Sequence, residues 1–349
     1  MRRPRWAVRR LAGCGSRGAG HPSHGYCARP TPTWTPSSRV GAGILPSCAL
    51  PPCDPAHRLP FSIVAAVAVV IPAYNPGSRL RCALESVVAQ TFRDWECIVV
   101  DDGGTEDLSW IDDYHPQVWR HRQENAGVSA ARNVGLMLTS APFVAFLDQD
   151  DEWLPAKLGH QVAVMRKGAD LCWTSFVWIH EINPDRPAIA HPVTYQEFLA
   201  DGHLCLSSLM VRRAAVGRIG GFSPMLRVQQ DYELLLRLLA AGSVAAPLST
   251  ILTRYNLHSN NVSGDYWTAC RERRNILELH RISAIRRGDG ATVRAARAGR
   301  HRMTRMYGIK AFDAFRATRR PIHLARAVVW NPRYVVPALV RAVGRTAPA

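Results

Sequence analysis

Apolar residues in this chain come in short continuous blocks separated by segments with helical spacing. Residues 63–71 form the first block, which ends at Pro72. It is a predicted strand, because crossing a bilayer needs ~20 apolar residues. The apolar positions from Leu80 to Val88 then recur at the spacing of a helix. Further along, the pattern predicts strands at 95–100 and 143–147 and helices at 108–114 and 129–138.

Strands that alternate with helices predict an α/β fold whose central sheet is mostly parallel and is flanked by helices. In such a sheet, ligand-binding groups gather at the carboxyl ends of the strands. Two acidic clusters stand at such ends, one at Asp101 and Asp102 and the other at Asp148, Asp150 and Asp151. Hard oxygen ligands suit Mg²⁺ or Mn²⁺, which commonly bridge a protein to a diphosphate. A solvated acidic turn that caps the next helix is the alternative.

The second half of the chain has a less regular pattern. Thr194 and Glu197 have the spacing of a capping box that opens a short helix. Residues 230–241 predict a strongly apolar helix that stops at Gly242. Strands are predicted at 171–182, 206–211 and 247–255, and two long Arg-rich helices at 266–317.

Composition divides the chain into three parts: residues 1–61, 62–265 and 266–349. The first part is rich in Arg, Pro, Gly and Ser and has no sustained apolar period. A segment of this kind cannot bury enough surface to offset its chain entropy, so we expect it to be disordered. It also lacks the apolar core of a secretory signal. We expect the middle part to be the folded domain that carries both acidic clusters and the last part to be a basic helical extension.

Positive charge is concentrated at the two ends of the chain. Residues 1–60 carry nine Arg and one Asp, and residues 266–349 carry eighteen Arg and one Lys against four acidic residues. Since the ends together exceed the net charge of +17, the middle is mildly acidic. Basic ends fit an anionic partner, and we expect an anionic membrane surface and no nucleic acid, because no signature for reading RNA or DNA accompanies the charge. A solvated helical face is the alternative.

The tail at 321–345 mixes apolar and aromatic residues with Arg326, Arg333 and Arg341. This composition suits a helix lying in a membrane interface, and a helix packed on the catalytic domain is the alternative. The nine cysteines form no CxxC pair and several lie in apolar blocks, which favours reduced thiols. We therefore expect a cytoplasmic protein, peripheral on the inner face of the membrane.

Seven segments of the chain, in order, resemble the motifs of inverting glycosyltransferases of family 2. They are VAVVIPAYN (67–75), LESVVAQTF (84–92), ECIVVDDGGTED (96–107), ENAGVSAARNVGL (124–136), FLDQDDEWLP (146–155), QDYELLLRL (230–238) and, more weakly, YNLHSNNVS (255–263). The resemblance implies that residues 62–265 form a catalytic domain with the GT-A nucleotide-sugar-binding fold, followed by a helical C-terminal extension. It also implies an enzyme of bacterial cell-surface glycan assembly that transfers a sugar from a nucleoside-diphosphate sugar, of the UDP or dTDP type, to a glycan or lipid-linked acceptor.

The resemblance assigns the nucleotide-sugar site to the ends of the first strands. Pro72, Ala73 and Tyr74 would form the wall on which the base rests, since an aromatic ring offers a stacking face. Asp101 would accept a hydrogen bond from the base imide, because a carboxylate is an acceptor only. Arg132 would contact the base or the diphosphate. A Tyr that packs on the strand edge and an Arg on the surface are the alternatives.

The acidic cluster matches the DxD positions of the family. Asp150 would be a direct ligand of Mn²⁺ or Mg²⁺, Asp148 would lie near the ribose or the metal, and Asp151 would be structural. His258 matches a late His that completes the metal site in some related enzymes, and a packing residue is the alternative for it. The ion would neutralise charge on the departing nucleoside diphosphate.

Asp231 is the expected catalytic base of a single displacement. It would take the proton from the acceptor hydroxyl as that oxygen attacks the anomeric carbon. Because Asp231 begins the helix predicted at 230–241, a helix cap is a compatible second role.

The chain departs from the family at three positions. Gln230 stands where Glu is more frequent, Gly104 where Ser is more frequent, and Asn256 where Arg usually follows the Tyr. The missing Glu and Arg affect the phosphate and acceptor contacts, but neither departure removes the expected base or metal ligand. Two other functions are disfavoured. A sugar-phosphate nucleotidyltransferase is disfavoured because no Lys precedes Lys157, and a non-catalytic anion-binding protein because the four site carboxylates are all present. The sequence names neither the sugar nor the acceptor nor the linkage.

Overall fold

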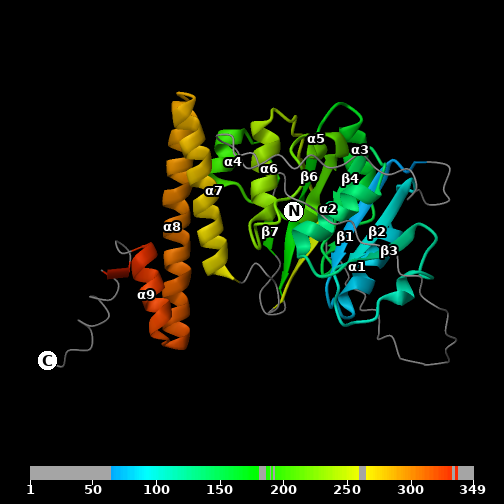
Figure 1. Ribbon diagram of the computed structural model, residues 1–349, viewed down its shortest axis with the longest axis horizontal. Helices are drawn as coiled ribbons and strands as arrows, with labels where there is room; N and C mark the ends of the chain where they lie inside the picture. The colour runs from blue at the N-terminus through cyan, green and yellow to red at the C-terminus, as the bar shows by residue number, and fades with distance from the viewer. Residues whose placement is uncertain are drawn as a thin grey trace, which may run out of the picture. The chain divides into compact units, whose positions relative to one another are not determined.

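The computed structural model describes residues 64–180, 186–188, 190–191, 193–258, 265–331 and 335–336 (Figure 1). The predicted disordered segment 1–61 and most of the tail beyond residue 331 lie outside the described residues.

Four parallel strands form the first half of the sheet. They are β1 (Val67–Ala73), β2 (Trp95–Asp101), β3 (Val118–Arg122) and β4 (Phe143–Phe146), in the spatial order β3-β2-β1-β4. The register pairs Ala73 with Asp101 and Asp101 with Arg122, so the first three strands end side by side. Helices α1 (Arg79–Val88) and α2 (Val128–Leu138) belong to the connections between these strands. The expected parallel arrangement of these strands is confirmed here, and both acidic clusters follow strand ends.

The second half of the sheet is mixed. β8 (Leu209–Arg212) runs antiparallel to β4, and β6 (Leu171–His180) runs antiparallel to β8. β9 (Leu248–Leu257) is parallel to β6, while the short strands β5 (Glu152–Trp153) and β7 (Arg186–Ala188) pair antiparallel with β9 and β6. The β5–β9 pair matters for function, because it brings the end of the acidic cluster beside the chain that leads to His258.

Alternate residues of β1 face opposite sides of the sheet, as the pleat requires. Val67, Val69 and Ile71 pack with α1 and with α3 (Lys157–Met165). Ala68 and Val70 belong to a second cluster, which includes side chains of α2, α4 (Tyr195–Asp201), α5 (Arg213–Arg218) and α6 (Gln230–Ala240). The central strands are therefore covered on both faces, which explains their continuous apolar sequences.

The C-terminal region consists of α7 (Tyr266–Arg286), α8 (Gly290–Thr318) and α9 (Pro321–Trp330). The two long helices predicted at 266–317 are confirmed as α7 and α8, which pack along each other (Figure 1). α8 also packs on α4, whose predicted capping box between Thr194 and Glu197 is present. Apolar residues of α7 and α8 belong to the same core cluster as β1 and α6. None of the helices in the described part of the chain is both long and apolar enough to span a membrane.

Three local predictions differ from the structure. The helix predicted at 108–114 is only a 3-10 turn (Ser109–Ile111), because Asp107 accepts hydrogen bonds from the N–H and hydroxyl of Ser109 and tightens the chain. The strand predicted at 206–211 begins at Leu209, after a second 3-10 turn (Leu206–Ser208). Strand β3 was not predicted, since its Arg and His residues interrupt the apolar pattern.

Helix α2 approaches β1 closely at Gly135. A Cβ atom at this position would collide with the buried side chain of Val70, so glycine allows the helix to lie against the strand. This contact fixes the height of α2 over the sheet and therefore the position of Arg132, one turn earlier on the same helix.

We expect Gly135→Ala to lower the free energy of unfolding by about 1–3 kcal/mol, because the added methyl group overpacks the α2–β1 contact. The matched control is Gly159→Ala in α3, where the new Cβ would lie 3.8 Å from Cβ of Phe92, an ordinary contact. This control should be neutral or more stable by up to about 1 kcal/mol, since alanine favours the helix. Urea denaturation measures both values, and equal stabilities would contradict the close-packing argument.

Candidate functional site

The end of β1 leads into an exposed aromatic residue. Pro72 and Ala73 are buried, whereas Tyr74 is 51% exposed. The backbone N–H of Tyr74 donates to Oε1 of Gln149 over 2.8 Å, and Nε2 of Gln149 donates to the Tyr74 carbonyl over 3.4 Å. Gln149 is the middle residue of the Asp-Gln-Asp sequence. It therefore ties the predicted base-binding wall to the acidic cluster, a role that the sequence did not indicate.

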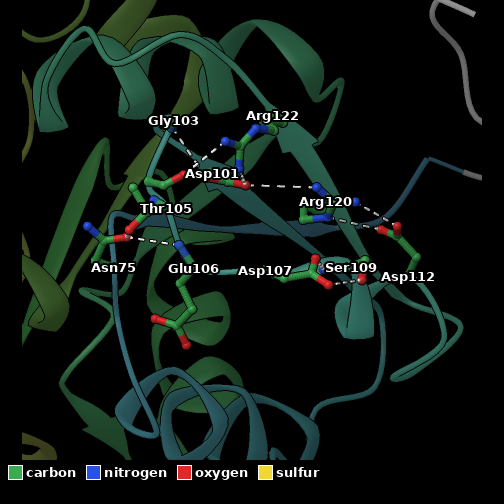
Figure 2. A network of polar contacts seen from close by, with 11 residues as sticks. Asn75, Asp101, Gly103, Thr105, Glu106, Asp107, Ser109, Asp112, Arg120 and Arg122 are labelled. Carbon is green, nitrogen blue, oxygen red and sulfur yellow. Dashed lines mark hydrogen bonds and ion pairs between the residues drawn. The ribbon is translucent and has the colours of Figure 1, made fainter. Parts of the chain in front are cut away.

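Asp101 is fully buried at the end of β2 and is already engaged (Figure 2). Its Oδ1 accepts the N–H of Gly103 over 3.2 Å, and its Oδ2 pairs with Arg122 over 2.6 Å. Arg122 also donates to the carbonyl of Gly104, where the family more often has Ser. An ionised carboxylate can accept about four hydrogen bonds, so further acceptor capacity remains on Asp101.

Asp102 holds the turn that precedes α2. Its Oδ1 accepts from Nε2 of Gln123 and from the N–H of Ala126, and its Oδ2 accepts from the N–H of Gly127, all within 2.9 Å. Gly127 has φ of 89°, a conformation that favours glycine, and α2 starts directly after it. Asp102 thus organises the loop from which Arg132 is presented.

A network on the opposite side of the β2 end is centred on Asn75. Its Oδ1 accepts the N–H groups of Thr105 and Glu106 over 2.8 and 3.2 Å (Figure 2). Glu106 in turn accepts the N–H of Gly77 over 2.8 Å. The loops after β1 and β2 are therefore joined by side chains that bond to backbone groups.

Arg132 lies at the centre of the site and is only 4% exposed. Its Nη2 pairs with Oδ1 of Asp148 over 2.5 Å, and the guanidinium carbon lies 5.4 Å from the centre of the Phe222 ring. Its Nε and Nη1 have no hydrogen-bond partner among the described residues. A buried guanidinium with unpaired donors is costly, and an anionic ligand would satisfy it.

Asp150 and His258 meet at the end of the acidic cluster. Oδ2 of Asp150 lies 2.7 Å from Nε2 of His258. Burial raises the pKa of the Asp150 carboxyl, and the negative charge of Asp148 raises it further, whereas His258 opposes the shift. A cation bound between these carboxylates would relieve their repulsion.

Asp151 has structural partners on two elements. Its Oδ2 accepts the hydroxyl of Ser207 over 2.5 Å, and its Oδ1 accepts the N–H of Asn256 over 3.0 Å. Burial raises the pKa of this carboxyl well above its usual range, and the charges of Asp148 and Asp150 add to the effect. The side chain of Asn256 donates to the carbonyl of Asp150 over 2.7 Å. Asn256, which replaces the family's Arg, therefore shapes the acidic loop.

The donor atoms at Asp148, Asp150 and His258 suit a divalent cation, because carboxylate oxygen and imidazole nitrogen bind Mn²⁺ and Mg²⁺. In the part of the chain that the structure describes, however, no three His, Cys, Asp or Glu side chains are grouped as a metal site. Asp148 points instead at Arg132, and Asp150 at His258. A cation would have to replace part of these two contacts.

Asp231 stands in the first turn of α6 and is partly exposed. Its Oδ1 accepts the N–H of Tyr232 over 2.7 Å. Burial raises the pKa of Asp231 to about 6, although that hydrogen bond and the charges of Arg132 and Arg273 oppose the shift. Asp148 also acts on this pKa, as it does on that of Asp150. The charge of Asp148 therefore raises the pKa of both Asp150, the expected metal ligand, and Asp231, the expected base. With a pKa of about 6, Asp231 is mostly ionised at neutral pH and can accept a proton.

A family model described as glycosyl transferase family 2 matches residues 68–207 of the chain. Among curated proteins, the chain is 28% identical over 231 residues to TuaG of Bacillus subtilis, named as a teichuronic acid biosynthesis glycosyltransferase; the match covers 62% of this chain and 91% of TuaG. It is 26% identical over 227 residues to WfaP of Escherichia coli, named as a UDP-Glc:alpha-D-GlcNAc-diphosphoundecaprenol beta-1,3-glucosyltransferase, covering 63% of this chain and 89% of WfaP.

Among solved structures, the fold resembles that of S. aureus TarS residues 1–349, crystallised in complex with UDP-GlcNAc. The TM-score is 0.57 at 16% sequence identity, and the match covers 76% of this chain and 79% of that chain. Against a longer TarS chain the TM-score is 0.51, and the match covers 42% of that chain. This likeness confirms the expected GT-A type of fold, including the helices that follow it.

Proposed function

We propose that this chain, which belongs to glycosyltransferase family 2, transfers a sugar from a nucleoside-diphosphate sugar to a hydroxyl group of a glycan or lipid-linked acceptor. The observation that carries the proposal is Arg132. This guanidinium is buried, has two donors without a partner among the described residues, and lies in the electrostatic environment that Asp148 and Asp231 share. The diphosphate of a nucleotide sugar would supply the missing acceptors. The anomeric carbon of its sugar would then lie near Asp231, a carboxylate able to accept a proton.

The donor we favour is a UDP-sugar, with a dTDP-sugar as the alternative. TarS was crystallised with UDP-GlcNAc, and WfaP is named for UDP-Glc. In this chain, the half-exposed ring of Tyr74, next to Pro72 and Ala73, offers a face for the base. Asp101 retains acceptor capacity for the imide N–H.

Asp150 and Asp148 would hold a divalent cation, Mn²⁺ or Mg²⁺, with His258 as the third ligand. When bound, the ion would supply a positive charge that stabilises the departing diphosphate.

Asp231 would act as the base. It accepts the proton of the acceptor hydroxyl while that oxygen attacks the anomeric carbon from the side opposite the diphosphate. The bond from carbon to the diphosphate oxygen breaks as the new glycosidic bond forms. One displacement of this kind inverts the configuration at the sugar and needs no covalent intermediate with the enzyme.

The acceptor class that we infer is a lipid-linked glycan of the bacterial cell surface. WfaP is named for a diphosphoundecaprenol-linked acceptor, and TuaG for teichuronic acid biosynthesis. Helix α9 supports docking on a membrane, because Ile322 and Val329 lie on one face and are 54% and 71% exposed. The helix follows exposed arginines at 316, 319 and 320. Apolar side chains flanked by Arg suit the interface of an anionic membrane.

The central test is Asp231→Asn. It should lower transfer by about 10²–10⁴-fold, the usual contribution of a general base, and leave UDP binding intact. Transfer is measured as UDP release from UDP-glucose or UDP-N-acetylglucosamine with Mn²⁺ and a GlcNAc-diphosphopolyprenol acceptor, and binding by calorimetry. Asp289→Asn, at the N-cap of α8, is the matched control. The structure places Gln229, not Asp231, at the N-cap of α6. A purely structural role of Asp231 in the first turn predicts full activity in both variants, and that result would refute the assignment.

Metal dependence is tested separately. A chelator should abolish transfer, and added Mn²⁺ or Mg²⁺ should restore it, because the carboxylates at 148 and 150 repel one another without a cation. Asp150→Asn should raise the Mn²⁺ concentration needed for half-maximal transfer by about 10–100-fold, while the exposed Asp113→Asn should not change it. Full activity in the presence of the chelator would contradict the metal assignment.

Membrane docking is tested with the double variant Ile322→Ser and Val329→Ser. Its affinity for vesicles containing anionic lipid should fall by about tenfold or more, since two apolar side chains no longer insert. Cosedimentation measures this affinity. The control replaces two exposed apolar residues elsewhere, Met225→Ser and Val244→Ser. Equal binding by both double variants would argue against α9 as the docking element.

A further inference from the structure

Helix α7 contacts the backbone that carries Asp231. Glu272 on this helix is 7% exposed, and its carboxylate accepts three successive N–H groups. Oε1 accepts from Arg227 over 2.8 Å, and Oε2 accepts from Val228 and Gln229 over 2.9 and 3.0 Å. These residues lead directly into α6, whose N-cap Gln229 makes no side-chain capping bond of its own. The Glu272 carboxylate therefore satisfies amides just before the helix, from a different part of the chain.

Arg273, the next residue of α7, holds the other side of the same turn. Its guanidinium carbon lies 3.6 Å from the centre of the Tyr232 ring. Its Nη2 donates to the carbonyl of Gly202 over 2.6 Å, and its Nη1 to Oε1 of Gln229 over 3.3 Å. Residues 227–229 before Asp231 and Tyr232 after it are thus in contact with α7.

Among the described residues, the turn has few other polar anchors, although the ring of Tyr232 also stacks on Phe198. The side chain of Gln230 donates to the carbonyl of Arg227, within the same loop. The hydroxyl of Tyr232 donates to the carbonyl of Leu199 over 2.8 Å. Neither contact reaches the acidic loop or α2. The polar contacts that hold residues 227–229 therefore come mainly from α7, whereas the rest of α6 is anchored by its apolar side chains in the core.

We propose that Glu272 and Arg273 are positioning residues for Asp231, so that the C-terminal helices form part of the transfer machinery rather than only a docking extension. The inference rests on the proposed function, since it takes Asp231 as the base. Glu272 sets the backbone on which the carboxylate stands, and Arg273 adds a positive charge beside it.

The charge of Arg273 gives this role a distinct signature. Arg273 lowers the pKa of Asp231 against the larger effect of burial. Removing the charge while keeping the bulk, as in Arg273→Met, should therefore raise this pKa above about 6. Several titratable or charged groups from different elements interact electrostatically with Asp231. They are Arg132, Asp148, Cys205, Arg273 and Tyr307.

The first experiment is Glu272→Gln in the full chain. We expect kcat to fall roughly ten- to hundredfold, because a small displacement of a catalytic group is costly, with UDP affinity unchanged. Amide hydrogen exchange at 227–229 should become faster. Glu278→Gln is the matched control, since it makes the same change on the same helix in a surface pair with Arg281. Wild-type kcat and unchanged exchange in Glu272→Gln would overturn the proposal.

The second experiment follows the Asp231 carboxyl by NMR in protein with ¹³C-labelled aspartate, assigned by its loss in Asp231→Asn. Arg273→Met should move the titration to higher pH, and Arg274→Met, whose arginine lies over Trp330 instead, should not. An unchanged titration in Arg273→Met would overturn the proposal. If Glu272→Gln does not fold, the titration of Asp231 in Arg273→Met tests the proposal by itself. Both the exchange and the titration are independent of turnover, so a wild-type chain that transfers no sugar would refute the proposed function without deciding this inference.

Discussion

The site depends on the ion pair between Arg132 and Asp148. The guanidinium comes from α2, which lies against β1, and the carboxylate comes from the loop after β4. The pair joins α2 to the acidic loop, and its arginine keeps two donor atoms without a partner among the described residues. A low-dielectric position strengthens every interaction of this charge, both with Asp148 and with a ligand. The loops on either side are arranged around that one buried cation.

Much of the fold follows from short-range patterns. Continuous apolar blocks predicted β1, β2 and β4 because central strands are covered on both faces, and the parallel order placed the carboxylates at one edge. Strand β3 escaped prediction because an edge strand can carry Arg and His on its exposed positions. Arg122 was missed for the same reason, since only the pairing of β3 with β2 brings it to Asp101.

Contacts between distant segments were the part that the sequence could not supply. In the sequence, Asn256 stands out only because it replaces the family's arginine. In the structure it donates hydrogen bonds to Asp150 and Asp151 across the β5–β9 pair. The charges of the C-terminal helices were read as a surface for lipid or solvent. Many of those arginines are exposed, but Glu272 and Arg273 turn inward to a loop more than forty residues earlier in the chain. Net charge cannot distinguish these two uses of the same residue types, because it carries no information on which face of the helix is covered.

Gln149 has a consequence for how the loops after β1 and β4 would respond to ligands. Its single amide group bonds to both the N–H and the carbonyl of Tyr74, while its neighbours on either side are the carboxylates of the acidic cluster. A displacement of either loop is therefore passed to the other through one rigid planar group. By thermodynamic reciprocity, a cation that tightens the hold on a base must itself be held more tightly once the base is present, and by the same factor.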